Sequence, residues 1–227
     1  MLDLVDSTLD EARRRGGPGP TWIMARMQSA ARGRRGRAWR MAPGDFAATL
    51  ILPVPEGQRA MARRSFVAAL ALHDALLAAA GPLALTLKWP NDVLLSGGKL
   101  AGILLEALGP RSLAVGIGVN LAAAPDAGDL EPGARAPAAL PMPVPPEVLL
   151  DHLAPAFARR EGTLAAQGFA PIREAWLARA DGIGAPMRAR IGGEDLAGAF
   201  EGIDGEGHLV LATAAGRRHL PAADILP

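Results

Sequence analysis

Residues 83–120 read LALTLKWPNDVLLSGGKLAGILLEALGPRSLAVGIGVN, a series of short apolar runs separated by turn residues. Runs of this length that are bounded by Gly, Pro and Asn-Asp are typical of β-strands. The short turn Ser96–Gly98 is able to join two of these runs as a hairpin. The predicted strands are Leu83–Trp89, Val93–Leu95, Lys99–Leu108 and Arg111–Leu121. This stretch therefore predicts consecutive strands of a sheet.

The residues before this stretch add strands and helices. The predicted strands are Leu2–Val5, Thr21–Met27 and Ala47–Val54, and the predicted helices are Thr8 to about Arg15 and Gln58–Ala80. Thr8 followed by Glu11 fits a capping box at the start of the first helix. Periodic apolar residues, including Phe66 and Leu70, predict the buried side of the second.

The character of the sequence changes near Asp181–Gly184. Before this point, Ala122–Pro146 is predicted as a surface loop, and Glu147–Gln167 and Pro171–Ala180 as helices. After it, short alternating runs separated by Gly-rich turns predict a small antiparallel β-barrel. The expected fold is therefore α+β, with a mixed sheet and helices in residues 1–182 and the barrel in residues 183–227.

The amino-acid composition excludes several classes of protein. The chain has 227 residues, half of them hydrophobic, and a formal net charge of +1. A protein that binds nucleic acid over its whole surface is usually more basic. There is no cysteine, which excludes disulfides and thiolate catalysis. The sequence has neither a signal-peptide pattern nor an apolar run long enough to span a bilayer, so we expect a cytoplasmic protein without membrane association.

The stretch Met24–Trp39, MARMQSAARGRRGRAW, is rich in arginine and glycine. Arginine presents a fixed fork of donors that matches carboxylate and phosphate oxygens, and glycine allows close approach of a ligand. Trp39 offers a flat face for stacking. The stretch indicates a mobile loop around an anion, although a nucleic-acid patch or a solvated basic loop fits these residues equally well.

Three further segments carry polar residues at the ends of predicted elements: Asp6–Thr8, Lys88–Asp92 with the following Gly97–Glu106, and Gly116–Asn120. Each has an ordinary explanation, because Ser and Thr cap helices, Asn-Asp after Pro forms turns, and a hairpin lysine is often solvated. Their joint occurrence with Gln28 and the arginine stretch, in this order, is far more specific.

The four segments together resemble those of biotin–protein ligases, which activate biotin with ATP and transfer it to a lysine of a carrier protein. QSAARGRRGRAW resembles the adenylate loop of that family, and KWPND, KLAGILLE and GIGVN resemble its central motifs. The resemblance covers nearly the whole chain. It implies a class II synthetase-like catalytic domain with a C-terminal SH3-like barrel, ATP and Mg²⁺ as requirements, and biotin as substrate.

Biotin's carboxylate must approach the α-phosphate of ATP, so the site needs cations that neutralise two anions. The resemblance assigns catalysis to Lys99, Lys88, Arg32 and Arg34. It assigns biotin to Ser7, Thr8, Gln28, Arg32, Gly33, Arg34, Lys99 and Gly102. It assigns ATP or the adenylate to Arg32, Arg34, Arg35, Arg37, Trp39, Lys88, Asn91, Lys99 and Asn120. Asp92 is the predicted Mg²⁺ ligand, either directly or through water.

Three residues depart from the family pattern. Leu9 stands where the family has Asn, Ala31 stands where the loop has Gly, and Asp45 stands where an uncharged turn residue is expected. A leucine cannot hydrogen-bond the biotin head group, alanine strains a position that needs positive φ, and Asp45 brings a negative charge near the phosphates.

These departures keep open a second function, a protein that holds biotin or its adenylate without transferring it. A lipoate or octanoyl transferase and an arginine-rich RNA-binding module are weaker alternatives, because neither explains all four segments. The expected acceptor is the biotin carrier domain of a carboxylase. Both monomers and homodimers fit the family. We expect no DNA binding, because there is no room before Asp6 for the helix-turn-helix of longer family members.

Overall fold

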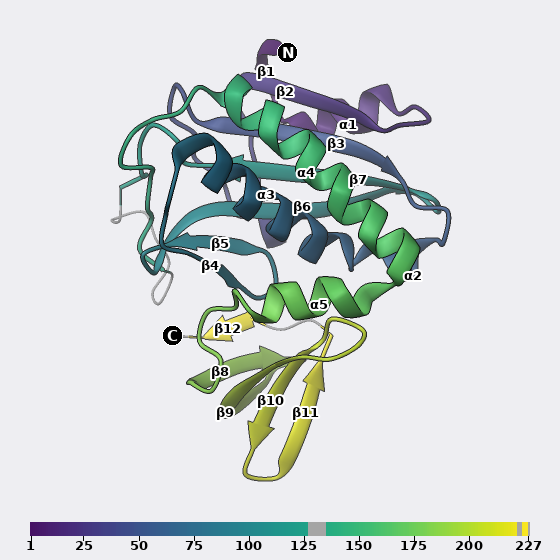
Figure 1. Ribbon diagram of the computed structural model, residues 1–227, viewed down its shortest axis with the longest axis vertical. Helices are drawn as coiled ribbons and strands as arrows, with labels where there is room; N and C mark the ends of the chain where they lie inside the picture. Colours follow the sequence, from purple (N-terminus) through teal and green to yellow (C-terminus); the bar gives the residue numbers. More distant parts are fainter. Residues whose placement is uncertain (127–134, 222–223, 227) are drawn as a thin grey trace.

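A computed structural model describes residues 1–126, 135–221 and 224–226 (Figure 1). A seven-stranded mixed sheet forms the larger part, in the order β1-β2-β3-β7-β6-β5-β4. β1 runs parallel to β2, and every other neighbouring pair is antiparallel. The strands are β1 (Leu2–Val5), β2 (Thr21–Gln28), β3 (Phe46–Pro53), β4 (Leu85–Lys88), β5 (Asp92–Leu95), β6 (Gly98–Gly109) and β7 (Ser112–Val119).

Helices cover both faces of this sheet. α3 (Arg64–Ala80) and α4 (Pro146–Gln167) lie together on one face (Figure 1). α1 (Thr8–Arg15) packs on the other, where Leu9 contacts a separate apolar cluster that includes Ile51 and Ala114. Because successive side chains of a strand point to opposite faces, Leu50 and Val115, next to these residues, join the α3–α4 core instead.

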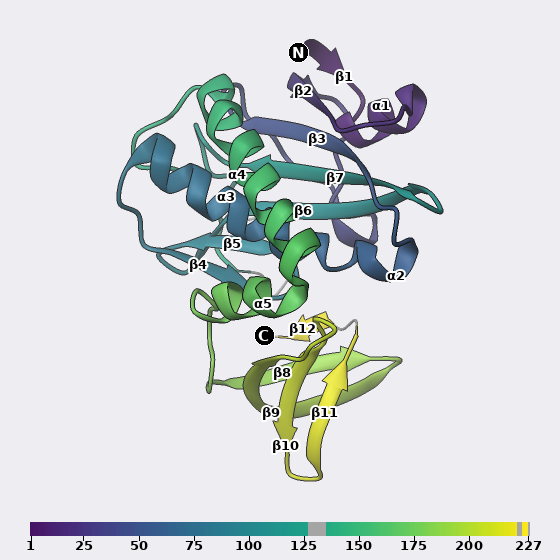
Figure 2. The same cartoon turned by 45° about the vertical axis from the view of Figure 1, so that its right-hand side comes forward.

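The C-terminal residues form a five-stranded antiparallel sheet in the order β11-β10-β9-β8-β12. It lies beyond the short helix α5 (Phe169–Leu177) in Figures 1 and 2. The strands are β8 (Pro186–Ile191), β9 (Glu194–Ile203), β10 (Leu209–Thr213), β11 (Gly216–Leu220) and β12 (Asp224–Leu226). The predicted α+β fold, with a mixed sheet and a small antiparallel β unit after it, is confirmed.

Five details of the secondary-structure prediction are wrong. Gln58–Ala80 is interrupted, so that α2 (Gln58–Met61) precedes α3. The buried Arg64 guanidinium donates to the carbonyl of Ala60 and to Glu161 on α4, and the Ala60 carbonyl is the acceptor that a continuous helix needs there. A single run of apolar periodicity cannot reveal such a tertiary contact.

Three of the other four errors concern element ends. Ser7, not Thr8, is the N-cap of α1, and its hydroxyl accepts hydrogen bonds from two backbone amides. β4 starts only at Leu85, and α5 starts at Phe169, which places Pro171 in its first turn, where proline is tolerated. β12 is absent from the prediction. The predicted loop 122–146 includes residues 127–134, which lie outside the described residues.

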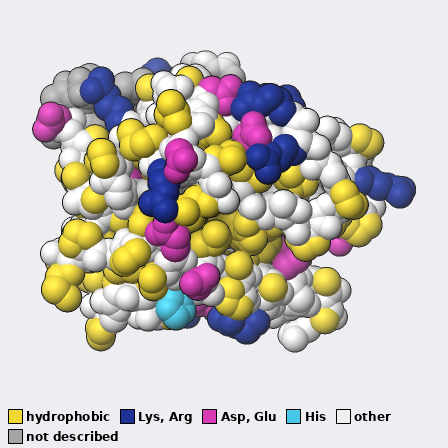
Figure 3. Space-filling model, turned by 90° about the horizontal axis from the view of Figure 1, so that it is seen from above, with side chains coloured by type: hydrophobic (Ala, Val, Ile, Leu, Met, Phe, Trp, Pro, Cys, Tyr) yellow, Lys and Arg dark blue, Asp and Glu magenta, His cyan; other side chains and the backbone are white. Residues whose placement is uncertain are grey.

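Charges on the molecular surface are mixed. On the face seen in Figure 3, Asp and Glu side chains lie beside Lys and Arg rather than leaving one continuous basic field. Among the helices that the structure describes, none has the length and apolar character needed to cross a membrane.

Candidate functional site

A cavity of about 670 Å³ opens on the sheet face that carries α1. Its walls come from the start of α1, the loop between β2 and β3, the turn between β4 and β5, strands β6 and β7, and side chains of the C-terminal sheet. Every residue predicted to bind biotin, ATP or metal lines this cavity: Ser7, Thr8, Gln28, Arg32, Gly33, Arg34, Arg35, Arg37, Trp39, Lys88, Asn91, Asp92, Lys99, Gly102 and Asn120. Their individual roles stay predictions.

Glycines make room on the cavity floor. A Cβ atom on Gly118 would lie 2.7 Å from the Trp39 ring, and one on Gly102 would lie 3.2 Å from it. A Cβ atom on Gly116 would lie 2.9 Å from Leu9 Cγ. Real Cβ atoms do not come as close as 2.7–2.9 Å to other atoms, so the glycines let the Trp39 ring and Leu9 lie directly on the sheet.

One end of the cavity is mostly uncharged. The Gln28 side-chain oxygen accepts hydrogen bonds from the backbone N–H of Thr8 at 2.8 Å and from its hydroxyl at 3.2 Å. The Thr8 hydroxyl in turn accepts from buried Thr49 at 2.8 Å. Leu9, only 5 % exposed, completes this end. Hydrogen-bonding groups within an apolar wall suit a compact polar head group on a ligand.

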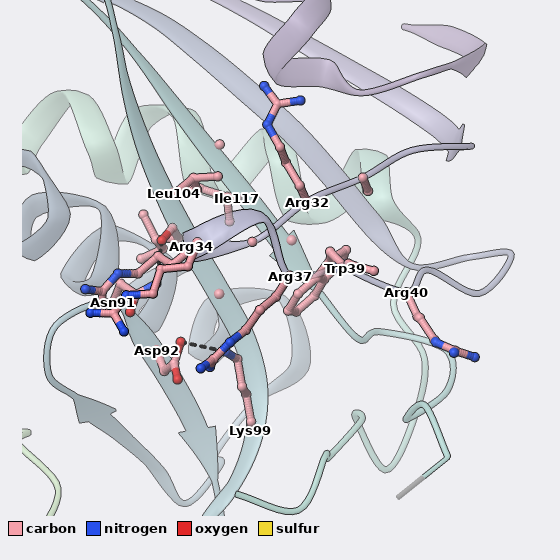
Figure 4. Close-up of a pocket in the computed structure, with 18 of the residues that line it drawn as sticks. Arg32, Arg34, Arg37, Trp39, Arg40, Asn91, Asp92, Lys99, Leu104 and Ile117 are labelled. Atoms are coloured by element: carbon pink, nitrogen blue, oxygen red, sulfur yellow. Dashed lines mark hydrogen bonds and ion pairs between the residues drawn. The ribbon is translucent and has the colours of Figure 1, made fainter. Parts of the chain in front are cut away.

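The other end gathers cations around one carboxylate. Lys99 Nζ lies 2.8 Å from Asp92 Oδ1 and 5.9 Å from the centre of the Trp39 ring (Figure 4). Asp92 Oδ1 is buried and has no hydrogen-bond partner, so the contact with Lys99 is an ion pair rather than an aligned hydrogen bond. Burial lowers the pKa of Lys88, and the nearby Asp92 partly opposes this shift. Burial and then the charge of Arg35 lower the pKa of Arg34.

A β-bulge directs Lys99 into the cavity. Val93 pairs with Ala101, but its neighbour Leu94 pairs with Lys99, which leaves Leu100 as an extra residue on β6. In regular alternation Lys99 and Gly102 would face opposite sides of the sheet, yet both line the cavity. The bulge therefore turns Lys99 to the open face and buries Leu100 completely.

The turn between β4 and β5 is held from several directions. The Asn91 side chain donates to the Ile103 carbonyl at 2.7 Å, and the Ser65 hydroxyl donates to the Pro90 carbonyl at 2.9 Å. The Trp89 indole donates to the Gly207 carbonyl, between β9 and β10, at 3.1 Å. These bonds fix the backbone between Lys88 and Asp92, whose side chains line the cavity.

Asn120 performs a similar task at the end of β7. Its side-chain amide is 3 % exposed and donates to the carbonyl of Ala138 at 2.9 Å and to that of Lys99 at 3.4 Å. Asn120 thus joins the end of β7 to the start of β6 and to the loop before α4.

The connection between β2 and β3, residues 29–45, is called the arginine loop here. It contains a short 3-10 turn at Arg34–Gly36, with Arg35 at φ 60° and Gly36 at φ 73°. Its base is closed by a bridge between Arg32 and Ala38. Figure 4 shows the Arg32 side chain extending away from Asp92 and Lys99. Its guanidinium is held by Asp10 and Glu106 instead.

Two of the departures from the family pattern have a structural explanation. Ala31 does not have a positive φ, so the expected strain of alanine is absent, and its carbonyl accepts from Trp39 N at 2.9 Å. Asp45 is 2 % exposed and accepts backbone N–H groups of Ala42 and Ala122 at 2.8 and 2.9 Å. It joins two loops and does not line the cavity, so the expectation of a negative charge near the phosphates is wrong.

Several cavity residues were missed by the sequence reasoning. Arg190 and Ile225 reach the cavity from the C-terminal sheet, and Arg135 reaches it from the loop before α4. Asp10 and Glu106 act on the site through Arg32. Asp10 and Glu106 have a local signal, because Asp10 lies two residues after Thr8 and Glu106 ends the segment Gly97–Glu106; the other three are brought to the site by tertiary structure.

A Mg²⁺ ion fits this donor set only if substrate oxygens share it. Within the part of the chain that is described, no three His, Asp or Glu side chains are grouped to hold a metal. Mg²⁺ commonly binds one or two carboxylates together with substrate phosphates. Asp92 is a carboxylate of this kind in the cavity, and its buried Oδ1 atom has no hydrogen bond but pairs with the Lys99 ammonium.

Comparison with known proteins shows the family of the chain. Residues 2–122 match the model of the biotin/lipoate A/B protein ligase family, and residues 182–226 match the biotin protein ligase C-terminal domain. The chain is 55 % identical to the biotin–[acetyl-CoA-carboxylase] ligase of Paracoccus denitrificans, over 99 % of this chain and 98 % of that protein. The chain belongs to the biotin/lipoate A/B protein ligase family.

More distant members of the biotin/lipoate ligase family are also similar. The bifunctional ligase/repressor BirA of Bacillus subtilis is 32 % identical over 99 % of this chain and 71 % of its own. The biotin protein ligase of Aquifex aeolicus, solved in complex with biotin and ATP, has the same fold, with a TM-score of 0.84 at 21 % identity. That alignment covers 99 % of this chain and 96 % of the other.

Proposed function

We propose that this protein is a biotin–[acetyl-CoA-carboxylase] ligase. It joins biotin and ATP into biotinyl-5′-AMP and transfers the biotinyl group to a lysine of the biotin carrier protein. The observation that carries the proposal is Lys99, which the β-bulge turns into the cavity beside Asp92 and the Trp39 ring. An ammonium group there would meet both a carboxylate bound by its uncharged tail and a nucleotide phosphate.

In the first reaction the chain offsets the repulsion between two anions. Lys99, Arg34 and Arg37 would neutralise the carboxylate and the α-phosphate as they approach, and Lys88 would contact the departing pyrophosphate. Preorganised charges of this kind lower the barrier without reorganising during the reaction. The ion pair with Asp92 holds Lys99 in place before substrates bind. The Trp39 ring, resting on Gly102 and Gly118, is the proposed adenine platform.

In the second reaction a carrier lysine attacks the mixed anhydride, an amide bond forms and AMP leaves. The leaving group is already activated, so the chain's main tasks are to orient the adenylate and exclude water. The uncharged end, with Thr8, Gln28 and Leu9, would hold the biotin ring system. Arg190 and Ile225, which line the cavity, would add contacts from the C-terminal sheet.

The finer assignments belong to the same proposal. Asp92 would contribute to a Mg²⁺ site shared with the triphosphate, which supplies further charge neutralisation when the ion is bound. The reaction would take place in the cytoplasm with the carrier domain of acetyl-CoA carboxylase as partner. A monomer suffices for the chemistry, because all the proposed residues line one cavity of one chain.

The test is transfer of radiolabelled biotin to a purified carrier domain with ATP and Mg²⁺. We expect transfer by the wild type and a loss of at least about a hundredfold in Lys99→Ala. A variant of Glu11, a partly exposed residue on α1 outside the cavity, serves as the control. Tight binding of biotin or its adenylate by the wild type without any transfer would overturn the ligase and favour a binding protein.

A further inference from the structure

Arg32 lies in a charge network that ties three separate elements together. One fork of its guanidinium meets Asp10, with Nη1 close to Oδ2 and Nη2 2.8 Å from Oδ1. Its Nε and Nη2 atoms lie 3.3 Å from the two oxygens of Glu106. The arginine belongs to the loop, Asp10 to α1 and Glu106 to β6. We call Asp10, Glu106 and Arg32 the Arg32 clamp.

Together with Arg13, the clamp is electrically balanced. Arg13 also contacts both carboxylates, at 2.8 Å from Asp10 and 2.7 Å from Glu106, so two cations and two anions form one network. The hydrogen bond from Arg32 is the main reason why the pKa of Asp10 is lowered. Both carboxylates are about a quarter exposed or less, which reduces screening by water. The charge of Arg32 is therefore neutralised by carboxylates of the protein. Arg34 lines the cavity and has no salt-bridge partner among the described ion pairs.

The clamp fixes where the loop lies rather than its internal shape. The loop closes on itself through backbone hydrogen bonds, with Gly33 N 2.7 Å from Arg37 O and Trp39 N 2.9 Å from Ala31 O. On the C-terminal side of the 3-10 turn Arg34–Gly36, Trp39 attaches the loop to β6 and β7. On its N-terminal side, the Arg32 clamp attaches the loop to α1 and β6. Releasing the clamp frees one leg of an otherwise intact loop.

We propose that Asp10 and Glu106 are positioning residues that, by holding Arg32, keep the arginine loop over the cavity and set how long the adenylate stays bound. This inference rests on the proposed ligase function. It also changes the role expected for Arg32, which becomes part of the loop's attachment instead of a direct contact with phosphate. Asp10 lies on the helix that begins with Thr8, and Glu106 lies on the strand that carries Lys99, so the clamp links the loop to both ends of the cavity.

The experiment measures the release of labelled biotinyl-adenylate from the enzyme after an excess of unlabelled adenylate is added. We expect Asp10→Asn and Glu106→Gln each to speed release by about tenfold, the loss expected from a charged hydrogen bond at a partly exposed site. The double variant and Arg32→Ala should resemble each other, because all three changes dismantle the same network. Asp10→Glu, which keeps the charge, should restore slow release.

A direct contact between Arg32 and the phosphate predicts the opposite change in the rate of adenylate release. If the carboxylates merely compete with phosphate for Arg32, neutralising them frees the arginine and release becomes slower, which would overturn the clamp. Release at the wild-type rate in the double variant would overturn it as well. Glu11→Gln is the matched control, because Glu11 pairs with Arg14 and Arg15 on the same helix but not with the loop. It should leave release unchanged.

Two further measurements separate the possible causes of failure. Melting temperatures of all variants should stay close to that of the wild type, since a general loss of stability would shift release and melting together. Added adenylate needs no catalytic turnover, so release can be measured even if the wild type transfers no biotin. An inactive wild type that still shows faster release in Asp10→Asn would reject the ligase function and keep the clamp.

Discussion

Lys99 Nζ and Asp92 Oδ1 lie 2.8 Å apart on neighbouring antiparallel strands, at the cationic end of the cavity. The pair depends on a bulge that no alternating pattern would produce. A lysine held by a carboxylate is oriented before its anionic ligands arrive. This relationship makes Asp92 the most informative position after Lys99 itself.

Asp92→Asn keeps the shape of the side chain and removes its charge. We expect adenylate formation to slow by on the order of a hundredfold, because Lys99 loses its orienting partner. Biotin-dependent exchange of pyrophosphate into ATP, measured over a range of Mg²⁺ concentrations, checks this. A higher Mg²⁺ requirement would support Asp92 as a metal ligand, and an unchanged requirement would limit its role to Lys99.

Lys88→Met should stabilise the free protein at neutral pH. The folded-state pKa of Lys88 lies below its unfolded value, so its stabilising contribution is present above the unfolded pKa and is lost as the pH falls through the folded pKa. Near pH 7 the buried charge is therefore a cost. We expect Lys88→Met to raise the melting temperature by roughly 2 °C at pH 7 and by less as the pH approaches 10, while adenylate formation falls.

A lower melting temperature for Lys88→Met at pH 7 would contradict that reasoning. Lys99→Met provides the comparison, because it leaves Asp92 buried without its ion-pair partner. This second variant should melt at a lower temperature than the wild type at the same pH.

Gly118→Ala should weaken ATP binding. The new Cβ atom would lie 2.7 Å from the Trp39 ring, so the ring must move away from the sheet. If Trp39 is the adenine platform, KM for ATP should rise about tenfold while KM for biotin changes much less. Gly109→Ala on β6 is the control, since its Cβ atom meets nothing within 4 Å. Equal changes in both KM values would count against the platform.

Leu9→Asn should separate packing from recognition. Leu9 is buried in the cluster beneath α1 and lies on Gly116, so an amide there should cost about 2 kcal/mol of unfolding free energy. If that amide reaches the biotin head group, biotin should bind about tenfold more tightly. Urea unfolding and calorimetric titration with biotin measure the two effects. Leu9→Ala, which loses the packing without adding an amide, should show only the first.

Much of the fold follows from local patterns. The apolar runs of 83–120 and their turns correspond to β4 through β7, because turn chemistry and strand propensity act within a few residues. The break before α3 does not follow in this way, since it arises where Arg64 meets Glu161, 97 residues away. β12 is equally hidden in the sequence, because three residues carry little periodicity.

The site shows the same division between local and distant effects. The residues predicted from the motifs line one cavity. They meet there because the strands that carry them are neighbours in the sheet. Asp45 was misread because its partner amide at Ala122 lies 77 residues away. The resemblance assigns Arg32 to the phosphate, whereas the carboxylates that hold it, Asp10 and Glu106, come from α1 and β6.

Of the 24 Lys and Arg residues in the chain, only Lys88 and Lys99 are lysine, and both line the cavity. Reagents that acylate primary amines consequently have three targets on this protein, these two side chains and the N-terminal amine. Protection of Lys88 and Lys99 from such a reagent thus reports occupancy of the cavity directly, without an engineered label. The same chemistry makes coupling to an amine-reactive support a poor choice, because it proceeds either through the N-terminus or through the site itself.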